Sequence, residues 1–159
     1  MIKTILILAG ITLLPFLELR ASIPYGILQT DLHWSVIFMI CVITNAILGP
    51  IIYFLLDKVL HIVLRIKFLN RIYHHYVEKM QNKIHKGVEK YGEWCIAIFV
   101  GIPLPGSGSY SGALAAYLMG LSYKKFIIAN LIGVIIAGIA VTAVVLTGDN
   151  LAHYFVKSL

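Results

Sequence analysis

Two charged residues, Glu18 and Arg20, stand inside an otherwise apolar part of the chain. A charged side chain in hydrocarbon costs at least about 2.5 kcal/mol, so both are expected to face the protein interior. A guanidinium binds phosphate through two parallel hydrogen bonds, and Arg20 is therefore predicted to bind an anionic head group. Burial favours the neutral form of a carboxylate, so Glu18 is predicted to carry a coupling proton. The alternative is a fixed structural pair between the two side chains.

A second motif combines proline, glycine and serine inside another apolar stretch. Its composition is similar to that of a phosphate-cradling loop, although it lacks the P-loop lysine. Helix N-termini just after Arg20 and after this loop would add N–H donors that converge on an anion. The predicted substrate-binding residues of this motif are Pro103, Pro105, Gly106, Ser107, Gly108 and Ser109.

Asn45 and Asn130 are the only asparagines inside the two longest apolar stretches. Both are included among the predicted substrate-binding residues. Carboxamides also form hydrogen bonds between packed membrane helices, and this structural role is the alternative for each.

The pattern predicts no metal site, no cofactor and no enzymatic activity. His74, His75 and Glu78 form the closest group of possible ligands, but adjacent helical residues point about 100° apart. No nucleophile with a base and an orienting partner can be identified. Cys41 and Cys95 lie in apolar surroundings without a paired spacing, so they are predicted to be small core residues.

These residues must be positioned by helices in a membrane. The chain has 159 residues, of which 60% are hydrophobic and 13% charged, so one membrane domain is predicted. Residues 34–56 and 126–147 are long enough to cross about 30 Å of hydrocarbon. Residues 5–17 and 94–121 are apolar but interrupted by the two motifs, and neither is a simple span. A cleaved signal peptide is the alternative for the first of them.

Basic residues are unevenly placed along the chain, whose formal charge is +6. Eight of the thirteen Lys and Arg residues lie in 57–93, which is predicted to be cytoplasmic. Apolar residues recur there at helical spacing, so a basic amphipathic helix is expected rather than a nucleic-acid-binding segment. Lys124 and Lys125 join this cluster on one face only if the interrupted stretches enter and leave by the same face. Two re-entrant hairpins are therefore predicted, around an internal polar site.

A weak internal repeat supports this topology. An offset of 85 residues places Glu18 on Pro103 and Asn45 on Asn130, and aligns a leucine, a serine and a tyrosine of the two motifs. Each half is predicted to contain one hairpin and one span, so the halves have opposite orientations, as in secondary transporters. The predicted fold is an all-α integral membrane protein with this inverted repeat. Its segments are hairpin 1–33, transmembrane helix 34–56, basic segment 57–93, hairpin 94–122, transmembrane helix 123–148 and tail 149–159.

The motifs ELRASIP at 18–24 and PLPGSG at 103–108 resemble those of the small multidrug export protein family, over about residues 17–147. That family is similar to the DedA superfamily. The resemblance implies two re-entrant hairpins, movement of phospholipids or polyprenyl-phosphate carriers, and dependence on the proton gradient. It places the family's acidic and arginine positions on Glu18 and Arg20. The chain departs from the DedA pattern in being shorter and in lacking a second arginine in its second hairpin.

We therefore expect a proton-linked membrane transporter or flippase for an amphipathic anionic substrate such as a lipid phosphate. One alternative is a small multidrug exporter, in which Glu18 binds a cation and Arg20 acts as its gate. The other is a membrane scaffold without transport activity. The expected partners are membrane lipids and a second copy of the chain, with no nucleic acid. The expected location is the plasma membrane, or the inner membrane of a bacterium with two membranes.

Overall fold

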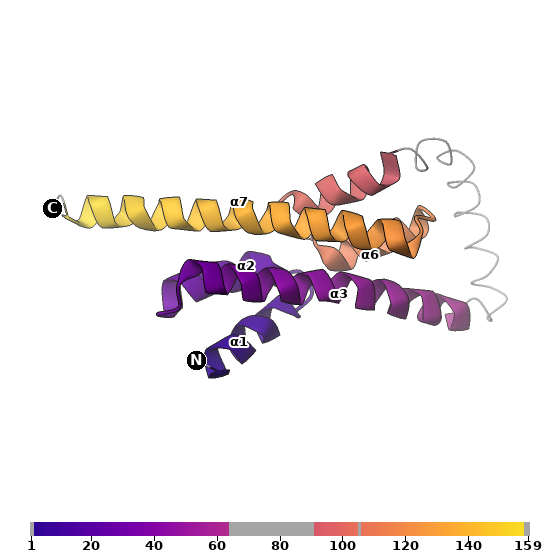
Figure 1. Ribbon diagram of the computed structural model, residues 1–159, viewed down its shortest axis with the longest axis horizontal. Coiled ribbons are helices and arrows are strands. Elements are labelled where there is room, and N and C mark those ends of the chain that lie inside the picture. The colour runs from indigo at the N-terminus through magenta and orange to yellow at the C-terminus, as the bar shows by residue number, and fades with distance from the viewer. Residues whose placement is uncertain (1, 64–90, 105, 158–159) are drawn as a thin grey trace.

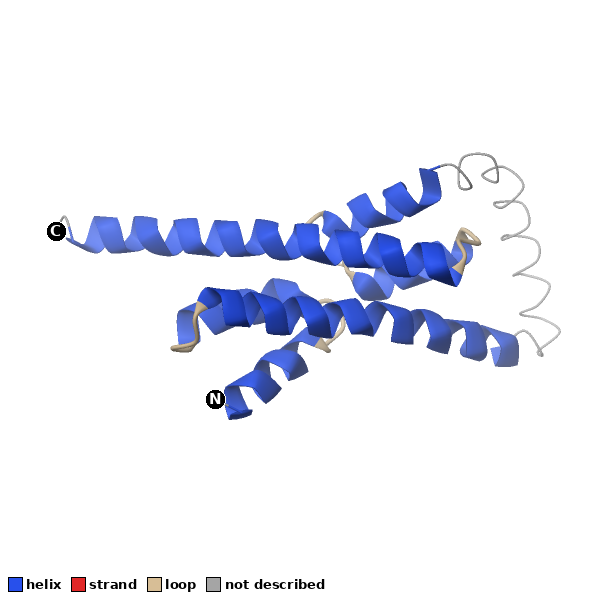
Figure 2. Ribbon diagram, in the orientation of Figure 1, coloured by secondary structure: helices blue, strands red, loops and turns tan. Residues whose placement is uncertain are grey.

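The computed structural model describes residues 2–63, 91–104 and 106–157, which form helices joined by short turns (Figure 1). The described helices are α1 (Ile2–Thr12), α2 (Glu18–Gln29), α3 (Trp34–Val63), the helix Tyr91–Gly101, α6 (Ser109–Leu118) and α7 (Tyr123–Lys157). Figure 2 shows no strand in this part of the chain. The predicted all-helical fold is confirmed. Most of the predicted basic segment, 64–90, lies outside the described residues.

Two helices are long and apolar enough to cross a membrane. The qualifying stretches are Trp34–Leu56 in α3, with 23 residues, and Tyr123–Gly148 in α7, with 26 residues. At 1.5 Å per residue they extend about 35 and 39 Å, against about 30 Å of hydrocarbon. Both stretches were predicted from the sequence. α3 and α7 pack against each other and run in opposite directions, as the colours of Figure 1 show.

The interrupted stretches form short helices instead of straight spans. α1, α2 and α6 contain 11, 12 and 10 residues, so each is about 15–18 Å long, roughly half of the hydrocarbon thickness. In Figure 1 α1 leads from the N-terminus toward the middle of the bundle, where the chain reverses, and α2 leads back toward the end where α3 begins. The helix Tyr91–Gly101 and α6 approach the middle from the other end. The two breaks therefore meet inside the bundle.

The outward face of α3 is apolar. Met39, Ile43, Ile47 and Ile51 recur every four residues on one face of the helix, and all are exposed. Exposed apolar surface of this extent is unfavourable in water, and hydrocarbon removes that cost. The surface of α3 therefore agrees with a membrane environment.

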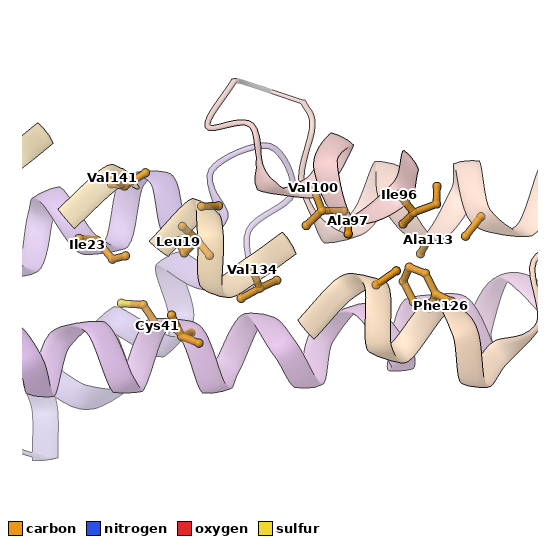
Figure 3. Packing of buried hydrophobic residues seen from close by; sticks show 14 of the residues in the cluster. Leu19, Ile23, Cys41, Ile96, Ala97, Val100, Ala113, Phe126, Val134 and Val141 are labelled. Atoms are coloured by element: carbon orange, nitrogen blue, oxygen red, sulfur yellow. The ribbon is translucent and has the colours of Figure 1, made fainter. Parts of the chain in front are cut away.

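Small residues allow the helices to approach closely. A Cβ atom at Gly133 of α7 would lie 2.7 Å from the carbonyl oxygen of Ala97 and from the Cβ of Val100. A Cβ atom at Gly138 would lie 2.8 Å from Val42 of α3. Figure 3 shows the resulting core, to which α2, α3, the helix Tyr91–Gly101, α6 and α7 all contribute side chains. In lipid such close packing replaces the hydrophobic effect as the source of helix association.

Candidate functional site

Glu18 is the first residue of α2 and lies in a strained backbone conformation. Its φ is 46°, and Phe16 in the preceding turn has a φ of 71°. A non-glycine residue in this left-handed region costs about 1–3 kcal/mol, and such residues concentrate at functional sites. The conformation turns the carboxyl group of Glu18 into the bundle, where the residue is 1% exposed.

The Glu18 carboxylate caps the N-terminus of α6. Its Oε2 accepts a hydrogen bond from the backbone N of Ser109 at 2.9 Å, and its Oε1 accepts one from the backbone N of Tyr110 at 3.2 Å. The N-cap residue of α6 is Gly108, which has no side chain for this purpose. A Cβ atom there would overlap the Glu18 carboxylate. A negative charge at this position also complements the positive end of the helix dipole.

Arg20 binds the opposite kind of helix end. One terminal nitrogen of its guanidinium donates to the carbonyl oxygens of Val100, Ile102 and Ser107 at 3.2, 2.9 and 3.0 Å. The first belongs to the last turn of the helix Tyr91–Gly101, and the others to the loop that follows. The other terminal nitrogen lies 3.4 Å from Oε2 of Glu18. Arg20 therefore supplies donors to carbonyl groups at the end of this broken helix and in the loop after it, of which the Ile102 carbonyl also accepts from the backbone N of Leu104 at 2.8 Å.

Asn45 of α3 completes the surroundings of Glu18. Its Nδ2 donates to Oε2 of Glu18 at 3.1 Å, and its backbone oxygen accepts a hydrogen bond from Oγ of Ser109 at 3.4 Å. Asn45 is 1% exposed, and its Oδ1 has no partner within the described part of the chain. The structure thus brings together the predicted residues Glu18, Arg20, Asn45 and Ser109.

The loop after Gly101 is a turn held by hydrogen bonds between its own residues. Ser107 bonds through its hydroxyl to the carbonyl oxygens of Ile102 and Leu104, at 2.6 and 2.9 Å, and also accepts from Arg20 at 3.1 Å. Gly106 has a φ of 88°, which a residue with a side chain adopts only with strain. Pro103 is exposed in this turn, and Pro105 lies outside the described residues.

Asn130, in contrast, lies away from Glu18 and bonds between helices. Its Nδ2 is 3.5 Å from the carbonyl oxygen of Ala46. That carbonyl lacks its helical partner because Pro50, four residues later, has no N–H. Gly49 leaves room for the carboxamide, since a Cβ atom there would overlap it. The interhelical alternative therefore describes the contacts of Asn130 better than the substrate-binding one.

Glu18 is one of the residues that line an apolar cavity of about 320 Å³. Its wall is formed by the turn before α2, by α3 and by the second broken segment, and includes Phe16, Ile52 and Leu114. Tyr110 also lines it, and its hydroxyl donates to the carbonyl oxygen of Leu13 at 2.7 Å, so it links α6 to the turn after α1. Glu18 is the one charged residue among the cavity's described lining residues.

Sequence reasoning missed Tyr110, the apolar wall and the carbonyl groups that bind Arg20. Tyr110 carried a signal, because the offset of 85 residues aligns it with Tyr25. The carbonyl groups that bind Arg20 also carried one, since a proline-rich segment that ends a helix removes N–H groups that would otherwise pair with its last carbonyls. The side chains His74, His75 and Glu78 lie outside the described residues. Both cysteines are free thiols, and Cys41 is buried as predicted, whereas the predicted core position of Cys95 is wrong because its side chain is exposed.

Comparison with known proteins gives one match. The sequence model of a family described as "Putative small multi-drug export protein" matches residues 18–140. The matched region begins at Glu18 and includes the contacts of Glu18, Arg20 and Asn45 described above. No curated protein and no solved structure matches the chain.

Proposed function

Since this chain belongs to the small multi-drug export protein family, we propose that it is a membrane transporter that binds its substrate in the cavity beside Glu18. The family and the two long apolar helices indicate a membrane protein. The observation that carries the proposal is the position of the Glu18 carboxylate. The carboxylate is buried where two broken helical segments meet, and Glu18 is one of the residues that line an apolar space of about 320 Å³.

In this proposal the two broken segments are re-entrant hairpins that enter from opposite faces. Each of their helices is too short to cross the hydrocarbon, and the breaks meet in the middle of the bundle. The two halves then form an inverted repeat with the site at the repeat interface, which is the arrangement of many secondary transporters. The basic segment between the halves is cytoplasmic, following the distribution of Lys and Arg.

Glu18 is also the proposed proton carrier. Its carboxylate is held by donors from α2, α3 and α6, so a proton taken up by Glu18 weakens contacts to three helices at once. Protonation removes the charge that complements the N-terminus of α6. A change in one carboxyl group would thereby loosen the second hairpin from the first, as alternating access requires.

The cavity favours an amphipathic cation over a lipid phosphate. A carboxylate at the end of an apolar cavity attracts an organic cation and repels an anion. Arg20, the residue expected to hold a phosphate, donates to backbone carbonyls instead and is not part of the cavity wall. Of the substrates expected from the sequence, the cationic one does not require Arg20 to leave these carbonyls.

A lipid phosphate remains the second candidate because of one orphan donor. The Nε of Arg20 is buried and has no hydrogen-bond partner in the described part of the chain. A phosphate group that reached this atom would satisfy a donor whose isolation costs about 1–3 kcal/mol or more. That binding mode requires the guanidinium to leave the carbonyls that it now holds.

Flux into proteoliposomes tests the proposal, with tetraphenylphosphonium as the lipophilic cation and an imposed pH gradient. We expect wild-type flux above that of empty vesicles, and its loss in Glu18→Gln. Glu93→Gln is the matched control, because Glu93 lies on the helix Tyr91–Gly101 beside a different pocket. Equal flux in wild type and Glu18→Gln contradicts the site.

Competition by a short-chain phosphatidate, abolished in Arg20→Lys, supports the lipid candidate. Absence of wild-type flux above that of empty vesicles contradicts the proposal and leaves the scaffold alternative.

A further inference from the structure

Only one of the two polar atoms of the Asn45 carboxamide has a hydrogen-bond partner in the described part of the chain. Its Nδ2 donates to Oε2 of Glu18 at 3.1 Å, whereas its Oδ1 is buried and has no partner among the described residues. We propose that Asn45 is the positioning residue that sets the protonation equilibrium of Glu18. Its Nδ2 donates to the carboxylate, and after rotation of the carboxamide its Oδ1 accepts a hydrogen bond from the carboxylic acid. This rests on the proposed role of Glu18 as the proton carrier.

The other groups that contact the Glu18 carboxyl group cannot change from donating to the carboxylate to accepting from the acid. The backbone N–H groups of Ser109 and Tyr110 donate only, and a guanidinium such as that of Arg20 has no acceptor. The Tyr110 hydroxyl is directed to the carbonyl oxygen of Leu13. A carboxamide carries both a donor and an acceptor on one rotatable group. Of the described side chains that hydrogen-bond to the Glu18 carboxyl group, Asn45 alone can accept the hydrogen bond that the protonated group donates.

Among the described residues, Arg20 is the charged group paired with Glu18, from their shared helix α2. From α6, Glu18 meets the two amide groups and the phenol of Tyr110, and from α3 it meets Asn45. Arg20 and both amides favour the ionised carboxyl group. A proton carrier held only by such partners would resist protonation. Asn45 adds to this preference through the hydrogen bond that it donates to the carboxylate, but with its carboxamide rotated it also offers the neutral acid an acceptor, which limits the cost of protonation.

Asn130 provides a matched control. It is also fully buried, and its Oδ1 likewise has no partner in the described region. It occupies the position of Asn45 in the second half of the chain, at the offset of 85 residues. Its contacts are the Ala46 carbonyl and Gly49, and not Glu18. Replacing it disturbs helix packing to a similar degree without touching the carboxyl group.

Infrared titration of the purified full chain in lipid bilayers tests this inference without a substrate. The carboxylic-acid C=O band that disappears in Glu18→Gln is assigned to Glu18 and followed with pH. In Asn45→Leu we expect its midpoint to rise by about one pH unit, because a hydrogen bond to a charged group is roughly twice as strong as one to a neutral group. The band should also move to the higher frequency of an acid with a free O–H.

A second variant guards against misfolding of the leucine variant. Asn45→Asp is nearly isosteric and places a second carboxylate beside the first, so the first proton should bind at a still higher pH than in Asn45→Leu. Asn130→Leu should leave the midpoint at its wild-type value. An unchanged midpoint in both Asn45 variants overturns the inference, as does an equal shift in Asn130→Leu.

The result is separable from the flux experiment. A shifted midpoint in the Asn45 variants together with no wild-type flux supports the role of Asn45 and rejects transport. Wild-type flux that depends on Glu18, together with an unchanged midpoint in both Asn45 variants, supports transport and rejects the role of Asn45. The role of Asn45 is also rejected if Glu18→Gln keeps every carboxylic-acid band of the wild type at every pH, because Glu18 then takes up no proton.

Discussion

The two broken segments compensate for their breaks in different ways. The first contains Glu18 and Arg20, whose side chains leave their own segment and reach the second. The second has no charged side chain between Gly101 and Leu118, but it presents a helix C-terminus and a helix N-terminus close together. The carboxylate caps one end and the guanidinium the other. The second break is therefore stabilised by the first, and not by residues of its own.

This asymmetry follows from the absence of water in a membrane interior. Unpaired N–H and C=O groups at a break cost several kcal/mol in hydrocarbon and must be satisfied within the protein. A guanidinium can serve several carbonyls, and a carboxylate can serve two amides, so one charge pair is sufficient for both ends. The structural role of the Glu18–Arg20 pair is compatible with the proposed function, in which a cap that binds or releases a proton would also control the break.

Removing the carboxylate should have the largest effect on stability. Glu18→Leu leaves the amides of Ser109 and Tyr110 without an acceptor and Arg20 without its counter-charge. We expect a loss of about 3–5 kcal/mol in the free energy of unfolding, measured by denaturant titration in mixed micelles. Glu93→Leu, outside this site, should cost much less. Equal losses in the two variants would show that the second break does not depend on the first.

A methyl group at the α6 cap should be the next most damaging change. In Gly108→Ala the new Cβ overlaps the Glu18 carboxylate, and we expect a loss of about 2 kcal/mol in stability. Combining it with Glu18→Ala should cost less than the sum of the two single changes, because the obstructed group is gone. Gly10→Ala is the control, since no atom lies within 4 Å of the added Cβ. Strictly additive effects would place the Glu18 carboxylate elsewhere.

The contact of Asn130 should have a smaller effect. Gly49→Ala places a Cβ against the Asn130 carboxamide, and we expect a loss of about 1–2 kcal/mol in the free energy of unfolding. Asn130→Ala in the same chain should recover part of that loss. If the double variant is no more stable than Gly49→Ala alone, the carboxamide does not lie on Gly49, and the substrate-binding alternative for Asn130 regains support.

The link from Tyr110 to the first break should be the weakest of these. Tyr110→Phe removes the hydrogen bond to the Leu13 carbonyl, and we expect a loss of about 0.6 kcal/mol, typical of side-chain bonds inside membrane proteins. Tyr25→Phe, at the equivalent position of the first half and exposed, serves as the control. A loss of similar size in both variants would remove Tyr110 as a specific bridge between the segments.

Much of the fold could be predicted because it follows from local composition. The stretches that became α3 and α7, and the two places where apolar segments break, are visible in the sequence, since transfer to lipid depends on runs of neighbouring residues. The close association of Glu18, Arg20, Asn45 and Ser109 was predicted only as a shared interior site. The predicted grouping of Asn130 with them does not agree with the contacts, because the Ala46 carbonyl that Pro50 leaves free binds it instead.

The sequence by itself determined that this protein has two long apolar helices, two breaks and an interior charge pair. Hydrophobic runs, prolines and isolated charges each determine the structure of the segment in which they lie. Only the tertiary structure decided which groups the charges serve. Glu18 and Arg20 bind backbone atoms 80 to 92 residues away, and backbone groups look alike in every sequence. The helix ends that need a partner became identifiable only once packing had brought the two breaks together.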